Sequence, residues 1–245
     1  MIDEEVRVEN EVAAISLVQK ALVNYPYKIV SKVFAWQGSK HGLGWIVQEY
    51  LPGEQLSIHF PDLQADKKAV VLDQVAQIFK MIQSFQHGDQ GFGGLRIGAE
   101  NILIDPGTLH ITGLLDFDFS HIASPADEYF YSFPSFCGLV PGPFEDEDLQ
   151  LLRRHQTEGF PSAPSTQEAT SESVDWTVAR LWQAALEKHN VASPKDIENI
   201  TELADIYWFL LDVCPPFFNL PRWLARKTEE QKLAAKKAIG ENLDR

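Results

Sequence analysis

Asn101 and Asp116 have the residue types and the spacing that a magnesium site uses. They bracket the segment NILIDPGTLHITGLLD, in which two short apolar runs flank the hairpin signal Pro-Gly-Thr at residues 106–108. A hairpin here would return the second strand beside the first and bring both side chains to one metal ion. Asp118 follows at a two-residue step, so strand alternation would place it on the same face as Asp116.

Such a site suggests phosphoryl transfer, which needs magnesium, held phosphates and a carboxylate beside the attacking hydroxyl. A kinase-type catalytic loop has this carboxylate five residues before the metal-binding Asn. Here that position is Arg96, and the nearest substitute is Asp89 in the tripeptide His-Gly-Asp at residues 87–89. The catalytic base is therefore either Asp89, brought close by a looped-out Gly-rich segment, or absent.

Each of these residues also has a purely structural interpretation. Asp116 and Asp118 would then be solvated carboxylates at the end of a strand, and Asn101 would cap a turn. The histidines have no metal-ligand spacing, and we expect them at the surface or in packing contacts. The tryptophans are expected in the core and at lobe interfaces, at positions 36, 45, 176, 182, 208 and 223.

The elements that position these residues can be predicted from hydrophobic periodicity. Apolar residues at three- and four-residue steps predict helices at residues 8–22, 66–86, 176–186 and 200–213. Strands rich in β-branched and aromatic residues are predicted at 28–36 and 44–51, as an antiparallel pair. The polar segment 156–173, with two prolines, is predicted to be an exposed loop.

Composition limits the possible partners and compartment. The chain has 245 residues, 44% of them hydrophobic, which is ordinary for a globular protein. Its 35 acidic and 21 basic residues give a formal charge of −14, which argues against nucleic acid or an anionic membrane as partner. The N-terminus lacks the apolar core of a signal peptide, and no apolar run approaches a membrane span. We therefore expect a soluble, cytoplasmic protein.

The block ENILID…ITGLLDFDFSHIASPADEYF resembles the aminoglycoside phosphotransferase family, in particular its fungal branch with choline-kinase-like relatives. That family has a loop of the form HGDxxxxNILVD followed by a strand ending in Asp-Phe/Trp-Asp/Glu. Further similarity lies in VENEVAAISLVQKAL (8–22), GWIVQEYLPGEQL (44–56) and WFLLDVCPP (208–216). The matching segments occur in the family's order and cover most of the chain.

The resemblance implies ATP and Mg²⁺ as cofactors and transfer of a phosphoryl group to a small-molecule hydroxyl. It implies Asn101 and Asp116 as metal ligands, with Asp118 in support. It also implies that the backbone at Gln48, Glu49, Tyr50 and Leu51 borders the adenine. Glu11 matches the helix glutamate that pairs with an ATP-binding lysine. Because no such lysine is evident here, we expect Glu11 to face solvent.

The fold implied is α+β and protein-kinase-like, with a reduced N-terminal sheet lobe (1–52) and a mainly helical C-terminal lobe (53–245). Only ten residues precede Glu11, too few for the strands that begin the family's fold, and the join between Ile97 and Gly98 resembles an internal deletion. Two alternatives to an active enzyme follow. The chain is a non-catalytic pseudo-phosphotransferase that binds a nucleotide or partner, or it is a partial product of a longer kinase gene.

Overall fold

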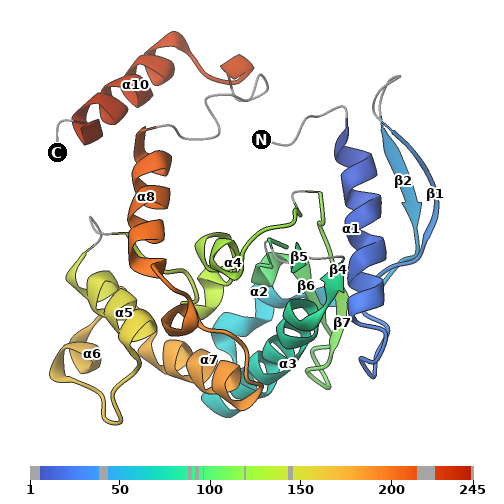
Figure 1. The fold of residues 1–245 in the computed structure, drawn as a ribbon, viewed down its shortest axis with the longest axis horizontal. Helices are drawn as coiled ribbons and strands as arrows, with labels where there is room; N and C mark the ends of the chain where they lie inside the picture. Colours follow the sequence, from blue (N-terminus) through green and yellow to red (C-terminus); the bar gives the residue numbers. More distant parts are fainter. Residues whose placement is uncertain are drawn as a thin grey trace.

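The computed structural model describes residues 6–38, 44–87, 90–91, 94–95, 97–118, 120–142, 146–213 and 224–243 (Figure 1). They form an α+β structure in which helices predominate and all strand pairing is antiparallel. The longer helices are α1 (Arg7–Ala21), α3 (Ala65–Ser84), α5 (Glu147–Glu158), α7 (Trp176–Lys188), α8 (Ile200–Val213) and α10 (Glu229–Leu243). The shorter ones are α2 (Leu56–His59), α4 (Pro125–Tyr131) and α6 (Thr166–Thr170).

The strands form three small sheets. β1 (Val33–Gln37) pairs with β2 (Trp45–Gln48), and β4 (Gln86–His87) pairs with β5 (Gln90–Gly91). The third sheet has the order β3-β6-β7, with β3 at Glu54–Gln55, β6 at Ile102–Ile104 and β7 at Ile111–Leu114. Both predicted hairpins are therefore confirmed, although the strands of each are shorter than predicted.

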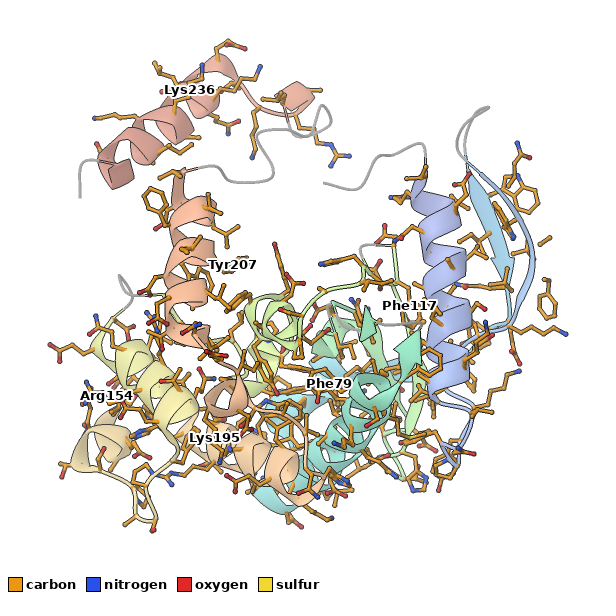
Figure 2. The ribbon with its side chains drawn as sticks, in the orientation of Figure 1. Phe79, Phe117, Arg154, Lys195, Tyr207 and Lys236 are labelled. Atoms are coloured by element: carbon orange, nitrogen blue, oxygen red, sulfur yellow. The ribbon has the colours of Figure 1, made fainter. Side chains whose placement is uncertain are left out.

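The core is built around α3, whose apolar face packs against α7 and α4. Phe79 of α3 lies edge-on to Tyr129 and Phe133, with ring centroids 6.0 and 5.0 Å apart (Figure 2). Trp182 of α7 also packs against Phe133, with the centroids of the two rings 4.7 Å apart. The helices predicted at 66–86 and 176–186 are thus confirmed, because their periodic apolar residues are the ones buried here.

Helix α1 lies between the β1–β2 hairpin and the rest of the molecule (Figure 1). Its residues Val8, Ile15 and Val18 are buried, which confirms the helix predicted at 8–22. The hairpin itself is thinly covered, and Trp36 and Trp45 are each 45% exposed. The expectation that these two tryptophans belong to the core is therefore wrong, because the contacts that the hairpin makes with α1 leave both side chains partly in solvent.

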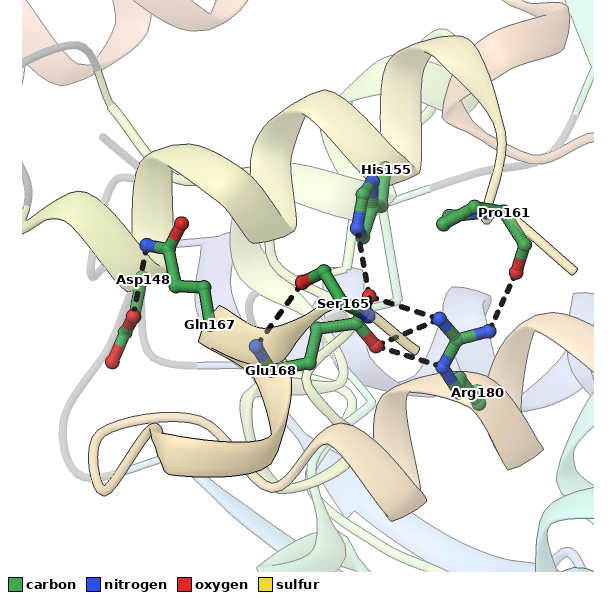
Figure 3. Close-up of polar contacts among 7 residues, drawn as sticks. All are labelled: Asp148, His155, Pro161, Ser165, Gln167, Glu168 and Arg180. Carbon is green, nitrogen blue, oxygen red and sulfur yellow. Dashed lines mark hydrogen bonds and ion pairs between the residues drawn. The ribbon is translucent and has the colours of Figure 1, made fainter. Parts of the chain in front are cut away.

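The segment 156–173 was expected to be an exposed loop, and this prediction is wrong in part. Helix α5 extends to Glu158, and α6 begins with a capping box in which Ser165 and Glu168 satisfy each other's backbone N–H groups. The Glu168 carboxylate is buried and receives two-pronged hydrogen bonds from Arg180 of α7 (Figure 3). The rest of this stretch agrees with the prediction, since residues 161–167 and 169–170 are exposed.

Helix α8 rises from the body of the molecule toward α10, which lies beyond its far end (Figure 1). The prediction of a helix at 200–213 is confirmed, and Ile200 and Ala204 near its start are buried. Leu203, Ile206 and Leu210 of the same helix are between 42% and 58% exposed. None of the helices in the described ranges is long and apolar enough to cross a membrane.

Candidate functional site

The open end of the β6–β7 hairpin brings Asn101 and Asp116 together. Ile102 is paired with Leu114, and one step beyond the ladder the backbone N–H of Leu115 donates to the Asn101 carbonyl at 2.8 Å. Asp116 is the next residue, so it lies beside Asn101 at the same end of the hairpin. At the closed end, the Asp105 carboxylate accepts the Gly107 N–H at 2.8 Å and fixes the predicted turn.

Asp118 reaches this end of the hairpin by a different route from the one predicted. β7 ends at Leu114, and Asp116 has φ of 62°, in the left-handed region that non-glycine residues rarely occupy. Strand alternation therefore does not apply, and the expectation based on it is wrong. After this turn Phe117 enters the core (Figure 2), and Asp118 is only 8% exposed while Asp116 stays at the surface.

Helix α1 supplies the wall opposite these carboxylates. The Asn10 amide donates to the backbone oxygens of Asp118 (3.3 Å) and Ser120 (2.8 Å), which fixes α1 against this loop. Arg7, one turn earlier, places its Nη1 3.3 Å from Asp118 Oδ2. Glu11, four residues after Arg7, lies on the same helix face and is partly buried. The expectation that Glu11 faces solvent is therefore wrong.

The carboxyl groups of Asp118 and Glu11 both have raised pKa values. Burial raises the pKa of Asp118 to about 6, helped by the hydrogen bond to Asp116 and its charge, while Arg7 opposes the shift. Burial also raises the pKa of Glu11, and the charge of Asp116 adds to this effect. Three carboxylates thus share a small region with one guanidinium, and the negative charge left over favours a bound cation.

A divalent cation fits this cluster on one structural observation. The Asp118 Oδ1 atom is buried and has no hydrogen-bond partner among the described residues, so it offers an unused oxygen ligand. The contact between Asp116 and Asp118 is a hydrogen bond only while one of the two carboxyl groups is protonated, because an ionised carboxylate has no hydrogen to donate. No group of three or more His, Cys, Asp or Glu side chains in the described ranges has the geometry of a metal site. Any such site therefore depends on the Asn101 amide and the two aspartates.

Glu128 on α4 is a residue that the sequence did not single out. Its carboxylate is fully buried and accepts the backbone N–H groups of Gly94 and Leu95, both at 2.7 Å, and the hydroxyl of Ser132. These bonds hold the backbone that leads into Asn101. No side-chain pattern marks this role, because the main partners of Glu128 are backbone amides distant in sequence.

The segment proposed to border adenine links the β1–β2 hairpin to the β3-β6-β7 sheet. Gln48 accepts the Ser31 hydroxyl at 3.1 Å, and Glu49 pairs with Lys28 at 2.6 Å. Tyr50 is 84% exposed, whereas Leu51 is buried. Leu51 packs closely on Gly113 of β7, where a Cβ atom added to the glycine would lie 3.2 Å from the leucine side chain. The segment is therefore fastened to the hairpin that carries Asn101 and Asp116. Contact with adenine stays a prediction.

The remaining predicted positions and the cavities add no further site residue. Asp89 and Arg96 lie outside the described residues. A cavity of about 510 Å³ lies between α3, α7 and the loop after α1. Tyr25, Tyr27 and His110 form its aromatic side. None of the predicted site residues lines this cavity.

Comparisons with known proteins neither add to nor restrict this description: no protein-family model matches the chain, and no curated protein does so either.

Proposed function

We propose that this chain is a kinase-like phosphotransferase that binds ATP with Mg²⁺ and phosphorylates a small-molecule hydroxyl. The observation that supports this most directly is the bond between Leu115 N–H and the Asn101 carbonyl, which sets Asn101 beside Asp116. An amide and carboxylates at one end of a hairpin are the ligand types that magnesium takes in phosphoryl-transfer sites. In this proposal the chain has a kinase-like bilobal arrangement, with residues 48–51 as the link between lobes.

Asn101, Asp116 and Asp118 would hold the ion, and it would offset the negative charge of the nucleotide phosphates. The protein's own contribution is positional. The backbone of the β6–β7 hairpin fixes Asn101 and Asp116. The Asn10 side chain holds the backbone at Asp118 and Ser120 by hydrogen bonds to their carbonyl oxygens. Asp89 is the candidate for the base beside the acceptor hydroxyl.

A thermal-denaturation series tests the proposal. ATP with Mg²⁺ at about 100 times Kd should stabilise the protein by about 2.7 kcal/mol, a rise of about 5 °C or more in Tm. Asp116→Asn should abolish the rise, whereas Asp66→Asn, a carboxylate on the exposed side of α3, should retain it. The absence of any ATP-dependent shift, with or without Mg²⁺, would contradict the proposal.

A non-catalytic nucleotide-binding module is the second candidate, and a specific contact favours it. Glu11 forms no ion pair with a lysine in the described part of the chain, and the cation nearest the cluster, Arg7, is engaged with Asp118. Transfer of labelled γ-phosphate to a library of small alcohols separates the two candidates. Binding with no transfer supports the module, whereas transfer that Asp89→Asn abolishes supports the enzyme and its base.

A further inference from the structure

Arg7 stands at a position that helix stability does not explain. It is the first residue of α1, and a cation there opposes the positive end of the helix dipole. Arg7 forms an ion pair with Asp118, 111 residues farther along the chain, at 3.3 Å. The placement is therefore explained by the carboxylate cluster and not by the helix.

The geometry shows how Arg7 is held over the cluster. The Asn10 amide anchors the same helix face to the backbone oxygens of Asp118 and Ser120. The Arg7 side chain is 43% exposed, while that of Asp118 is 12% exposed, so the guanidinium lies on the solvent side of a nearly buried carboxylate. A cation that approaches Asp118 from solvent thus meets Arg7 first.

We propose that Arg7 is a resident counter-ion of the Asn101–Asp116–Asp118 site, with which a divalent cation must compete for the charge of Asp118 in order to bind. The proposal rests on the function proposed above and adds a control on metal affinity that is built into α1. One oxygen of Asp118 is engaged by Arg7, and the other is buried and accepts no hydrogen bond from an N–H or hydroxyl donor of the described residues. The two cations therefore compete for a single carboxylate.

Competition between Arg7 and a divalent cation for Asp118 predicts how the charge of Arg7 affects metal affinity. A guanidinium and a divalent ion at the same carboxylate repel each other, and even at the dielectric constant of water this repulsion corresponds to about tenfold in affinity. Removing the charge at position 7 should therefore tighten metal binding. Glu11 cannot replace Arg7 in this role, because its own charge attracts the metal.

Titration with Mn²⁺ alone, followed by the electron paramagnetic resonance signal of the free ion, tests this inference on the full chain. Arg7→Gln should bind Mn²⁺ about tenfold more tightly than the unmodified protein, and Arg7→Lys should bind as the unmodified protein does. The matched control is Arg154→Gln. Arg154 is exposed on α5, far from α1 in Figure 2, and its loss changes the net charge equally.

The outcomes separate this inference from the proposed function. If the unmodified protein binds Mn²⁺ and Arg7→Gln binds no more tightly than Arg154→Gln, the counter-ion role is refuted and the metal site stands. If no variant binds Mn²⁺, with or without ATP, the proposed function fails and the inference fails with it. Weaker binding by Arg7→Gln would also overturn the inference, because it would make Arg7 a support of the site.

A second measurement applies if Arg7→Gln does not fold. In nitrogen-15 spectra of the unmodified protein, the side-chain N–H signal of Arg7, assigned with Arg7→Lys, should move as Mg²⁺ is added. The signal of Arg180, which is bound to the buried Glu168, should stay in place and serves as the internal control. An Arg7 signal that does not move at saturating Mg²⁺ would refute the competition.

Discussion

At the scale of single residues, the carboxylate cluster is arranged at a cost to stability. Asp118 is nearly buried between the charges of Asp116 and Glu11, and its ion pair with Arg7 does not compensate for them, since the pKa of Asp118 rises to about 6. A group whose ionised form is disfavoured to this extent is typical of a site kept for binding or catalysis. The cluster therefore permits a prediction about stability.

Replacing Asp118 with Asn should stabilise the metal-free protein above pH 6. Protonated Asp118 is favoured in the folded state, so its contribution is complete below the unfolded pKa near 3.8 and is lost as the pH rises through about 6. Two pKa units correspond to about 2.7 kcal/mol, and we expect about 1 kcal/mol because the cluster borders solvent. Urea denaturation at pH 8 and at pH 4, in chelator, measures the difference.

The comparison needs a carboxylate whose pKa shifts the other way. Asp148 serves this purpose, because hydrogen bonds from Ser171 and Gln167 lower its pKa. Asp148→Asn should bring no gain in stability at pH 8. A loss of stability in Asp118→Asn at pH 8 would show that the ion pair with Arg7 outweighs the repulsion and would contradict the prediction.

The sequence predicted part of this cluster and could not predict the rest. The hairpin that leads from Asn101 to Asp116 was predicted correctly, because a tight hairpin is a local structure that its turn residues specify. The approach of Arg7 and Glu11 depends on how α1 docks against a loop more than 100 residues away, and periodicity contains no information on that. The left-handed conformation of Asp116 was likewise not predictable, because no glycine marks it.

At the scale of elements, α4 holds the segment that leads into Asn101, because the carboxylate of Glu128 binds the backbone of that segment. Glu128→Gln replaces one acceptor oxygen with a donor that faces the N–H groups of Gly94 and Leu95. We expect a loss of about 1.5–3 kcal/mol in the free energy of unfolding, the range for a hydrogen bond to a charged group. Hydrogen exchange should show faster opening at residues 94–101 than elsewhere in the core.

The control for this contact is Glu158→Gln, an exposed carboxylate at the end of α5. It should leave both stability and exchange unchanged. Equal exchange rates at 94–101 in Glu128→Gln and Glu158→Gln would show that α4 does not hold this segment. Metal binding in Glu128→Gln should weaken, because Asn101 follows directly from the loosened backbone.

Helices α5, α6 and α7 are joined by a buried charge pair. Glu168 receives bonds of 2.7–2.9 Å from Arg180 and lies 3.2 Å from the ring of His155. Arg180→Leu leaves Glu168 buried and unpaired, and should destabilise the protein by about 3–5 kcal/mol at pH 8. The double variant with Glu168→Leu should recover most of this loss. Chemical denaturation of the single and double variants is the measurement.

The same pair also has a predictable pH dependence. Burial raises the pKa of Glu168, but hydrogen bonds from Arg180 and Ser165 outweigh it, so the folded pKa lies below the usual 4.5. The stability that this carboxylate contributes is present above pH 4.5 and is lost as the pH falls through the lowered value. The difference in the free energy of unfolding between Arg180→Leu and the unmodified protein should therefore become smaller at acidic pH. A difference that does not change with pH would show that Arg180→Leu destabilises the protein through lost packing and not through the unpaired charge.

The helix α6 within residues 156–173, which were predicted to be a loop, has a recognisable signal in the sequence. Ser165 and Glu168 have the spacing of a capping box, so the start of α6 could be predicted from the sequence. The burial of Glu168 could not, since it depends on Arg180 arriving from another helix. Helix α3 presented no such difficulty, because its apolar period extends from Val71 to Ile82 and packing follows the period.

At the scale of the whole molecule, the order of elements predicts an α+β protein, and the structure agrees at that level. The arrangement of the parts is less predictable, because it depends on contacts between segments distant in sequence. Phe79 of α3, for example, meets residues of α4 and the turn after it, whereas the charged helix α10 contacts chiefly the far part of α8 (Figure 1). Stability should therefore differ widely between the body and α10.

Hydrogen exchange should show this difference directly. No side chain described in α10 is buried, and a helix of 15 residues without packing is marginal in water. Its amides should therefore exchange by local opening, at least about a thousandfold faster than those of α3, which open only with global unfolding. Mass-spectrometric exchange at two protein concentrations is the measurement. Protection of α10 that equals that of α3 and grows with concentration would contradict the prediction. It would mean that α10, with the exposed apolar residues of α8, is buried against a second copy of the chain.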